Sequence, residues 1–566
     1  MFKKKPFRTV PFFVIFVLSL FLVIIFWEDV FPQSDASNHS VIVRVLDENG
    51  FPTPARIRFA GLDDTYYAPE GHEPDLPVKN WLCLGGDVIL DYGRRFTYID
   101  GQFRISLPLA DITVEAVKGY AYRILIDTLT VTPKTDTLDI RLERWFRFPD
   151  EDWYSGDVHV HLISPEAGVL ESKAEDLNVC NILTFDYPAL SKDLVSNQYL
   201  FIGKQDPVSE AKHIVYINQE YREDGLGHMV FLNLKKLISP VNTMRKYHYP
   251  LNLTACDEVH AQGGFTAIGH FSQFPGFEWP LGVIMRKVDA LELFSVAMPF
   301  QSPQSGNWDL IPDQQGNSAM RLWYRLLNCG LRIPVVAGTD KYRKMVTLGA
   351  NRVYACVDDS FTYENWITAL KSGRSFITNS PFLFLHINGK MTGDSIHLKP
   401  GESLNIKADV WCQFPLDRLE IIANGEVIAE QFIRANGEHS SLSFTYTPRE
   451  SCWITARAYE SPQPHKKRGI NFSHNPINGN RRKTTHFNRY YGTNLPEVPF
   501  AHTNPLYVTV GGKPIHSKTD AEYYVRYLDN TIQFLRTEGR FPSEEAKQSV
   551  LRQFEEGRQR FLDLSK

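Results

Sequence analysis

Short apolar runs alternate with helix-forming stretches between residues 149 and 380, and this alternation constrains the fold more than any other feature of the sequence. The seven runs cover residues 157–162, 179–185, 214–218, 229–234, 265–269, 288–294 and 333–338. Two helical stretches, over 318–329 and 363–372, are followed by glycines, which commonly end helices. Buried strands alternating with helices are typical of an α/β domain with a parallel sheet, and seven strands are enough to close into a barrel.

The segments on both sides of this block alternate with a period of two and predict β-sandwich-like domains. In the first segment, valine recurs at every second position, as Val41, Val43 and Val45. The second contains a cation-rich insertion over roughly 461–498, which we interpret as a solvated loop in preference to an anion site. The predicted domains therefore cover residues 39–148, 149–380 and 381–511.

The last segment, residues 512–566, predicts a C-terminal helical pair. Its first helix carries apolar residues that recur at spacings of four and three, namely Ala521, Val525, Leu528, Ile532 and Leu535. This spacing places them on one face of a helix. We expect the pair to pack back onto the barrel or a sandwich, with a dimer contact as the alternative.

The N-terminus has the pattern of an export signal. Four basic side chains among the first eight residues precede an apolar segment over 12–27, which is 16 residues long. As a helix it would span about 24 Å, slightly less than the ~30 Å hydrocarbon core of a bilayer. Because basic clusters stay on the cytoplasmic side, we expect the rest of the chain to be periplasmic or extracellular. We favour a retained N-terminal transmembrane segment within residues 1–38 and keep a cleaved, secreted form as the alternative.

Charge and motif content exclude several classes of function. The 566-residue chain has 61 Lys and Arg against 65 Asp and Glu, a net charge of −4, which excludes a general nucleic-acid binder. Its 7 cysteines contain no Cys-x-x-Cys pair, which excludes a thiolate zinc site and a disulfide scaffold. Neither Gly-x-Ser-x-Gly nor a phosphate-binding Gly-x-x-x-x-Gly-Lys loop is present.

Histidines and carboxylates cluster at the ends of the seven apolar runs. His159 and His161 are two residues apart, so on a strand they point to the same side, as ligands of one metal ion do. The third run is followed by Glu220, the fifth by His270 and the seventh by Asp340. Strand ends in a barrel converge on its C-terminal face, where active sites form.

His228 is the exception in this set, because it comes at the start of the fourth run instead of the end. Nitrogen and oxygen ligands without sulfur suit a divalent transition metal such as Zn²⁺, Mn²⁺ or Fe²⁺. A bound metal ion lowers the pKa of water toward ~7, which makes hydroxide available at neutral pH. The strand ends therefore predict a metal-dependent hydrolase.

The central block resembles the PHP (polymerase and histidinol phosphatase) metallohydrolases, and more closely their CehA/McbA, carbaryl-hydrolase-like branch. The segments that carry the resemblance are residues 156–162, 219–234, 268–270, 323–340 and 366–381, with further similarity at 43–47, 54–57 and 502–510. The resemblance implies a distorted seven-stranded (β/α) barrel flanked by N- and C-terminal β-sandwich-like domains.

The same resemblance implies roles for individual residues. The implied metal ligands are His159, His161, Glu166, Glu220, His228, His270 and Asp340, with Glu220 as the bridging carboxylate. The family commonly carries Thr-Asp-His after its second strand and Asp-x-His at its final motif. Here the segments read Thr-Phe-Asp-Tyr at 184–187 and Asp-Lys-Tyr at 340–342. With two histidines fewer, we expect one or two metal ions instead of three.

Two residues of the final motif are expected to act in catalysis. Asp340 would steer the proton of the attacking water, and Tyr342, in place of a histidine, would donate a hydrogen bond to a substrate oxygen. Lys341 and Arg343 are further candidates for stabilising charge on the substrate, although a surface loop is the simpler interpretation.

Three functions agree with these patterns. The first is an exported, membrane-anchored metal-dependent hydrolase that acts on a phosphoester, ester, amide or carbamate bond of a small-molecule or envelope-derived substrate. The second is a non-catalytic PHP-like protein of the cell envelope that binds a ligand, and the two missing histidines favour it. The third is a structural envelope protein in which the metal only stabilises the fold.

Overall fold

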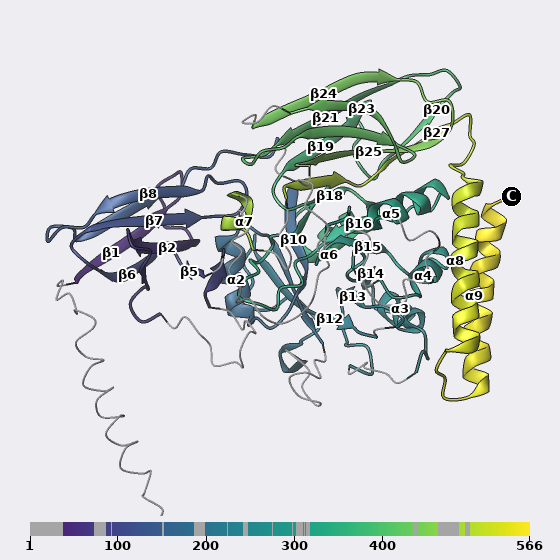
Figure 1. Ribbon diagram of the computed structural model, residues 1–566, viewed down its shortest axis with the longest axis horizontal. Coiled ribbons are helices and arrows are strands. Elements are labelled where there is room, and N and C mark those ends of the chain that lie inside the picture. Colours follow the sequence, from purple (N-terminus) through teal and green to yellow (C-terminus); the bar gives the residue numbers. More distant parts are fainter. Residues whose placement is uncertain are drawn as a thin grey trace, which may run out of the picture.

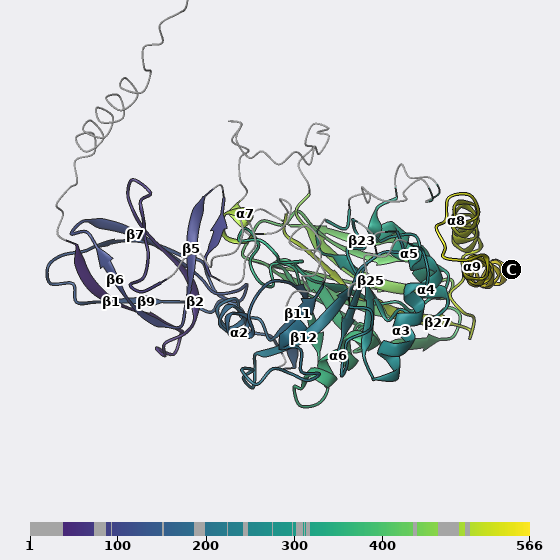
Figure 2. The same ribbon diagram turned by 90° about the horizontal axis from the view of Figure 1, so that it is seen from below.

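The computed structural model is mostly β, since strands make up a larger share of the described residues than helices do. The structure describes residues 38–566 except 73–85, 92, 150–151, 186–197, 224, 242–246, 274, 297, 301–309, 311, 313–316, 434–437, 462–485 and 493–497. An N-terminal β region and the C-terminal helices lie at opposite ends of the molecule, with the central region between them (Figures 1 and 2).

Two sheets face each other in the N-terminal region. One contains β6 (Gln102–Leu107), β1 (His39–Leu46) and β9 (Thr137–Arg141). The other contains β4 (Val88–Leu90), β5 (Arg94–Ile99), β2 (Ala55–Gly61), β7 (Asp111–Val117) and β8 (Leu125–Thr130), with β3 (Tyr66–Tyr67) paired to β2. Val41, Val43 and Val45 are buried in the core between them, because alternate residues of a strand face one side.

The central region contains seven strands at the positions of the seven apolar runs. They are β10 (Trp153–Val160), β11 (Val179–Thr184), β12 (Ile214–Tyr221), β13 (Met229–Leu232), β14 (Phe265–Ile268), β15 (Ala290–Phe294) and β16 (Val335–Ala337). The connecting segments contain the helices α2 (Pro165–Ala174), α3 (Asn252–Ala261), α4 (Trp279–Ile284) and α5 (Ala319–Asn328) and the short 3₁₀ helix η1 (Gln198–Leu200). The seven strands are neighbours in chain order within one sheet.

These strands do not close, and the prediction of an α/β fold with a seven-stranded (β/α) barrel is wrong. Within the described part of the chain, β16 pairs with β15 alone, and it is only three residues long. The outer edge of β10 pairs instead with β17 (Arg352–Cys356), which runs antiparallel to it. An isolated bridge between Val160 and Lys341 is what joins the two ends of the series. A strand as short as β16 cannot provide the ladder of hydrogen bonds that closure requires.

The sheet continues past β10 into the second β region. Its further strands are β17, β18 (Ser375–Thr378), β26 (Phe500–Thr503), β25 (Cys452–Tyr459), β22 (Arg418–Ala423) and β23 (Glu426–Phe432), with α6 (Tyr363–Ser372) between β17 and β18. A 15-stranded, mixed sheet therefore runs through both regions where two separate domains were expected.

A smaller sheet covers this extension. It consists of β19 (Phe382–Ile387), β21 (Leu404–Trp411) and β24 (His439–Tyr446), while β20 (Ser395–Leu398) pairs with β27 (Leu506–Val510). Phe384 and Ile406 from the small sheet and Ile421 and Ile454 from the large one are buried in a common core. The short helix α7 (His486–Tyr490) lies next to β4 of the N-terminal region.

β13 runs antiparallel to both of its neighbours, β12 and β14. Parallel neighbours need a crossover of a dozen or more residues, and only residues 222–228 separate β12 from β13. The start of β13 consequently lies at the sheet edge where β10, β11, β12 and β14 end. This reversal decides where His228 is placed.

The chain ends in two antiparallel helices, α8 (Lys518–Thr537) and α9 (Glu544–Leu564), which pack on the central region (Figure 1). The Tyr524 hydroxyl donates to the Leu322 carbonyl at 2.6 Å. Gly557 lets α9 approach α4 closely, since a Cβ there would lie 2.4 Å from Leu281.

None of the described helices is long and apolar enough to cross a membrane. The predicted N-terminal transmembrane segment, over 12–27, lies outside the described residues, so it stays a prediction. Most of the cation-rich insertion, residues 462–485, also lies outside them.

Candidate metal centre

His159 and His161 converge at the end of β10. Their Nε2 atoms lie 3.0 Å apart, and both rings are buried. His159 is the penultimate residue of β10 and His161 directly follows its last residue, so both side chains leave the same face of the strand. The His-x-His spacing therefore brings the two rings together as expected.

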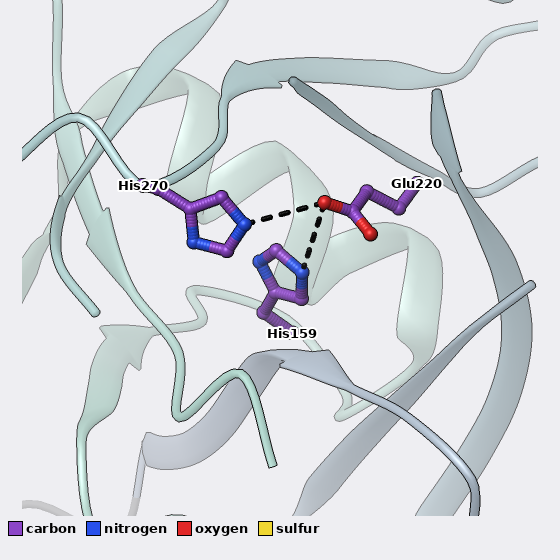
Figure 3. A group of neighbouring side chains, drawn as sticks. All are labelled: His159, Glu220 and His270. Carbon is purple, nitrogen blue, oxygen red and sulfur yellow. Dashed lines mark hydrogen bonds and ion pairs between the residues drawn. The ribbon is translucent and has the colours of Figure 1, made fainter. Parts of the chain in front are cut away.

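Glu220, in β12, reaches between this pair and two further histidines. Its Oε2 lies 3.4 Å from His161 Nε2, whereas its Oε1 lies 2.9 Å from His228 Nδ1 and 3.2 Å from His270 Nε2. Figure 3 shows the side chains of Glu220, His159 and His270 pointing toward one another. The two oxygens of one buried carboxylate thus face different histidines.

Asp340 approaches the same histidines from the segment after β16. Its Oδ1 lies 3.3 Å from His161 Nε2 and 3.7 Å from His159 Nε2, and its Oδ2 lies 3.9 Å from His270 Nδ1. The backbone of Asp340 has a φ of +47°, in the left-handed region. A non-glycine residue in this conformation carries strain, which is common at functional sites.

Buried Asp157 fixes the turn that presents Asp340. Its carboxylate accepts hydrogen bonds from the Thr339 amide at 2.9 Å, the Thr339 hydroxyl at 2.6 Å and the Gly349 amide at 3.0 Å. The His161 amide donates to the Lys341 carbonyl at 2.8 Å. These bonds tie the end of β10 to the residues on both sides of Asp340.

Glu292, on β15, belongs to the same cluster of side chains, and our sequence interpretation missed it. Its carboxylate is fully buried and lies 3.0 and 3.1 Å from His159 Nδ1, and it accepts a 2.7 Å hydrogen bond from the His270 amide. A carboxylate on the second nitrogen of a histidine orients the ring as a metal ligand. The signal was a lone acidic residue inside the apolar run Ala-Leu-Glu-Leu-Phe.

His228 joins the cluster because β13 is reversed. It precedes the first residue of β13, at the edge where Glu220 ends the neighbouring strand. The sequence interpretation kept His228 among the ligands but as the exception, because a strand start lies at the opposite edge of a sheet whose strands are all parallel. The antiparallel pairing removes that objection.

Two overlapping groups have ligand atoms close enough to hold a metal ion. In each group these atoms all lie within 4.8 Å of one another, and the groups are His159, Glu220 and His270, and His159, His161 and Asp340. Buried histidine and carboxylate side chains are the ligands that Zn²⁺, Mn²⁺ and Fe²⁺ accept. The described residues therefore include a site that could hold a divalent ion.

The hydrogen bonds of the His159 and His161 rings show that this set fits a cation. His161 Nδ1 lies 3.1 Å from the Leu183 carbonyl, which can only accept, so that nitrogen carries a hydrogen. His159 Nδ1 faces the Glu292 carboxylate in the same way. In the neutral rings both Nε2 lone pairs then point at each other across 3.0 Å, which is repulsive unless a proton or a metal ion lies there.

The pKa values agree with this need for positive charge. Burial disfavours the charged ring of His161, but hydrogen bonds to Asp340 and Glu220 outweigh it and raise the pKa to about 9. Burial is likewise outweighed at His270, where Asp340 and Glu220 raise the pKa to about 9. Although burial opposes it, Arg222 and His228 hold the pKa of Glu220 well below its usual value.

Neither group of ligand atoms includes the further predicted residues Glu166, Lys341, Tyr342 and Arg343. Glu166 is exposed in the first turn of α2 and belongs to neither metal-binding group. Lys341 is buried, and its Nζ donates to the Val346 carbonyl at 2.8 Å and pairs with Glu171 at 3.4 Å. Tyr342 is half-buried, with the Arg343 guanidinium 4.7 Å from the centre of its ring. The segment Asp186-Tyr187, where the family has a ligand histidine, lies outside the described residues.

Comparisons with known proteins give no family for this chain. No protein-family model matches the sequence, and no curated protein matches it. Among solved structures, the chain is similar to PsfC from Pseudomonas syringae PB-5123, with 15% sequence identity and a TM-score of 0.25. That alignment covers 39% of this chain and 90% of the PsfC chain. A TM-score this low supports no conclusion, so membership of the PHP family stays a prediction.

Proposed function

We propose that this chain is a metal-dependent hydrolase whose active centre is built around Glu220. The observation that carries the proposal is the position of this carboxylate, with Oε2 toward His161 and Oε1 toward His228 and His270. Carboxylates that separate two sets of histidines commonly bridge two metal ions. The resemblance to the CehA/McbA branch of PHP metallohydrolases points to the same chemistry.

The geometry divides the ligands into two sets. His159 Nδ1 is engaged by Glu292, so only its Nε2 remains for a metal ion, and one nitrogen serves one ion. We assign His159 to the ion that His161 and Asp340 also hold. The Glu220 carboxylate would then share a second ion with His228 and His270. Zn²⁺, Mn²⁺ and Fe²⁺ all suit this ligand set.

The protein residues orient these groups and handle protons. A divalent ion held here supplies Lewis acidity and makes water a nucleophile at neutral pH. Asp340 has a side chain that is 13% exposed, so it reaches solvent and can take the proton of an attacking water. Glu292 holds the ring of His159, and Tyr342 is our candidate donor to an oxygen of the substrate.

A small panel of chromogenic substrates tests the proposal. The full-length chain, loaded with Zn²⁺ or Mn²⁺, should hydrolyse at least one p-nitrophenyl phosphate, acetate, anilide or carbamate derivative. His161→Asn should remove that activity, because this substitution removes a ligand nitrogen of the first ion. Absence of turnover on all four bond types in a metal-loaded sample would contradict a hydrolase.

A non-catalytic envelope protein that binds a ligand through the same site is the second candidate. The buried ion pair of Lys341 with Glu171 favours it, because that contact takes one candidate for charge stabilisation away from the site. Metal binding without turnover on any bond type would support this candidate.

We further propose that the chain is exported and attached to a membrane by its N-terminal segment. The support is the basic cluster ahead of the apolar residues 12–27. Protease added to intact cells, or to spheroplasts where there is an outer membrane, should digest residues 38–566. Protection equal to that of a cytoplasmic control would contradict export.

A further inference from the structure

Arg222 lies beside the carboxylate of Glu220, on the side that faces His161. It directly follows Tyr221, the last residue of β12, and its Nε is 3.8 Å from Glu220 Oε2. Oε2 is also the oxygen that faces His161, at 3.4 Å. Because residues two apart on a strand share a face, Arg222 and Glu220 point to the same side of the sheet.

An aromatic ring holds the guanidinium in this position. The Cζ of Arg222 lies 5.3 Å from the centre of the Phe185 ring, within the range of a cation–π contact. The Phe185 ring in turn packs on His161, with ring centres 4.1 Å apart. The guanidinium therefore lies on the side of the candidate site where Phe185 packs on His161.

The side chain of Arg222 is also more exposed to solvent than the side chains of the neighbouring ligands. Its side chain is 17% exposed, against 2% for Glu220 and 2% for His161. Among the ligand side chains, Asp340 at 13% and His228 at 11% come closest to this value. Arg222 is therefore more exposed than any of these ligand side chains.

A permanent positive charge at this place weakens metal binding, because it repels a divalent ion. A site that only held metal ions would gain from a neutral residue here. A guanidinium suits an anion, since its fork of N–H donors matches two oxygens of a phosphoryl or carboxylate group.

We propose that Arg222 binds an anionic group of the substrate, a phosphoryl or carboxylate group, beside the ion held by His159, His161 and Asp340. That the anion is part of a substrate rests on the proposed function, but the binding of an anion can be measured without turnover. Such an anion site favours charged substrates over neutral esters, amides and carbamates.

The test is calorimetric titration of the full-length, metal-loaded chain with inorganic phosphate and, separately, with acetate. The variants are Arg222→Gln, which removes the charge, and Arg222→Lys, which keeps it without the fork. Arg552→Gln, at an exposed position of α9, is the matched control. The metal content of every sample is measured alongside.

We expect Arg222→Gln to weaken anion binding roughly ten- to a hundredfold at unchanged or higher metal content, as loss of a charged hydrogen bond would. Arg222→Lys should recover part of the affinity, and Arg552→Gln should behave as the parent. Binding of phosphate but not acetate would identify a phosphoryl group, and tighter binding of acetate would identify a carboxylate.

Equal anion affinity in the parent and Arg222→Gln would overturn the inference, as would a parent that binds neither anion at millimolar concentration. A parent that holds no metal would instead contradict the proposed function. In that case the same titration of the metal-free chain tests the anion site. Weaker anion binding by Arg222→Gln than by the parent would support the site, and equal binding would overturn it.

Discussion

Nε2 of His159 and Nε2 of His161 lie 3.0 Å apart, although the hydrogen-bond partners of both rings leave lone pairs on these two atoms. Something positive must lie between them. In the metal-free protein a proton can lie there. Although burial opposes it, hydrogen bonds to Asp340 and Glu220 raise the pKa of His161 to about 9. Protons and metal ions therefore compete for the same place, and this competition makes the site sensitive to pH.

The first prediction concerns the pH dependence of the metal-free chain. The folded state raises the pKa of His161 and His270 to about 9, above the value of about 6.5 in an unfolded chain. The stability that each contributes is complete below about pH 6.5 and is lost as the pH rises through about 9. Thermal unfolding of the metal-free parent and of His270→Gln should show a difference in midpoint that shrinks over this window. A difference that stays constant from pH 6.5 to 9 would contradict the ion pairs described here.

The second prediction concerns two ligands from different strands. His159→Ala and His270→Ala should each abolish metal binding or activity, because each removes a ligand from one of the two sets that meet at Glu220. Circular dichroism should show the β regions still folded. His439→Ala, on the exposed face of β24, is the control that should keep full metal content. Full metal and activity in both site variants would mean that the site is elsewhere.

The third prediction concerns Glu292, which touches His159 but is not itself a proposed ligand. Glu292→Gln should lower metal affinity about 10–100-fold, since the amide no longer fixes the ring as a carboxylate does. Glu420→Gln is the matched control, because Glu420 is also a buried glutamate on a strand, paired there with Arg457 far from the site. Competition with a chelator measures both affinities. Equal affinities in the two variants would remove Glu292 from the site.

The fourth prediction concerns Tyr342. If its hydroxyl donates to a substrate oxygen, Tyr342→Phe should keep its metal content and lose about 10²–10³ in kcat, the usual cost of one such donor. The structure also offers a simple packing role, since Arg343 covers the ring. Unchanged kcat in Tyr342→Phe, on any substrate the parent accepts, would show that Tyr342 has a packing role and does not act in catalysis.

The positions of the strands could be predicted from the sequence, but their closure could not. Apolar runs indicate where buried strands lie, and β10 to β16 occupy the seven runs. Which edges pair depends on residues far apart in the chain, such as Trp153 and Cys356, and on the shortness of β16. Neither leaves a local signal.

The candidate site was predicted in part. Spacing and strand ends were enough to select His159, His161, Glu220, His270 and Asp340. Residues two apart on a strand point to the same side, so the spacing of two residues predicts where their side chains point. His228 was doubtful because the direction of β13 follows from a loop length that was not considered. Glu292 was missed because no fixed sequence spacing relates a metal ligand to the residue that orients it. Glu166 was placed by resemblance alone.

The most direct test of this account is the metal content of the full-length chain after expression in medium supplemented with zinc and manganese. Elemental analysis of the purified parent should find at least one transition-metal ion per chain, because His159, His161, His270, Glu220 and Asp340 offer ligand atoms close enough together to hold one tightly. Glu220→Gln should lose most of it, since this residue faces both sets. A parent with less than about 0.2 ions per chain would contradict the account, because a site with these ligands stays occupied through purification.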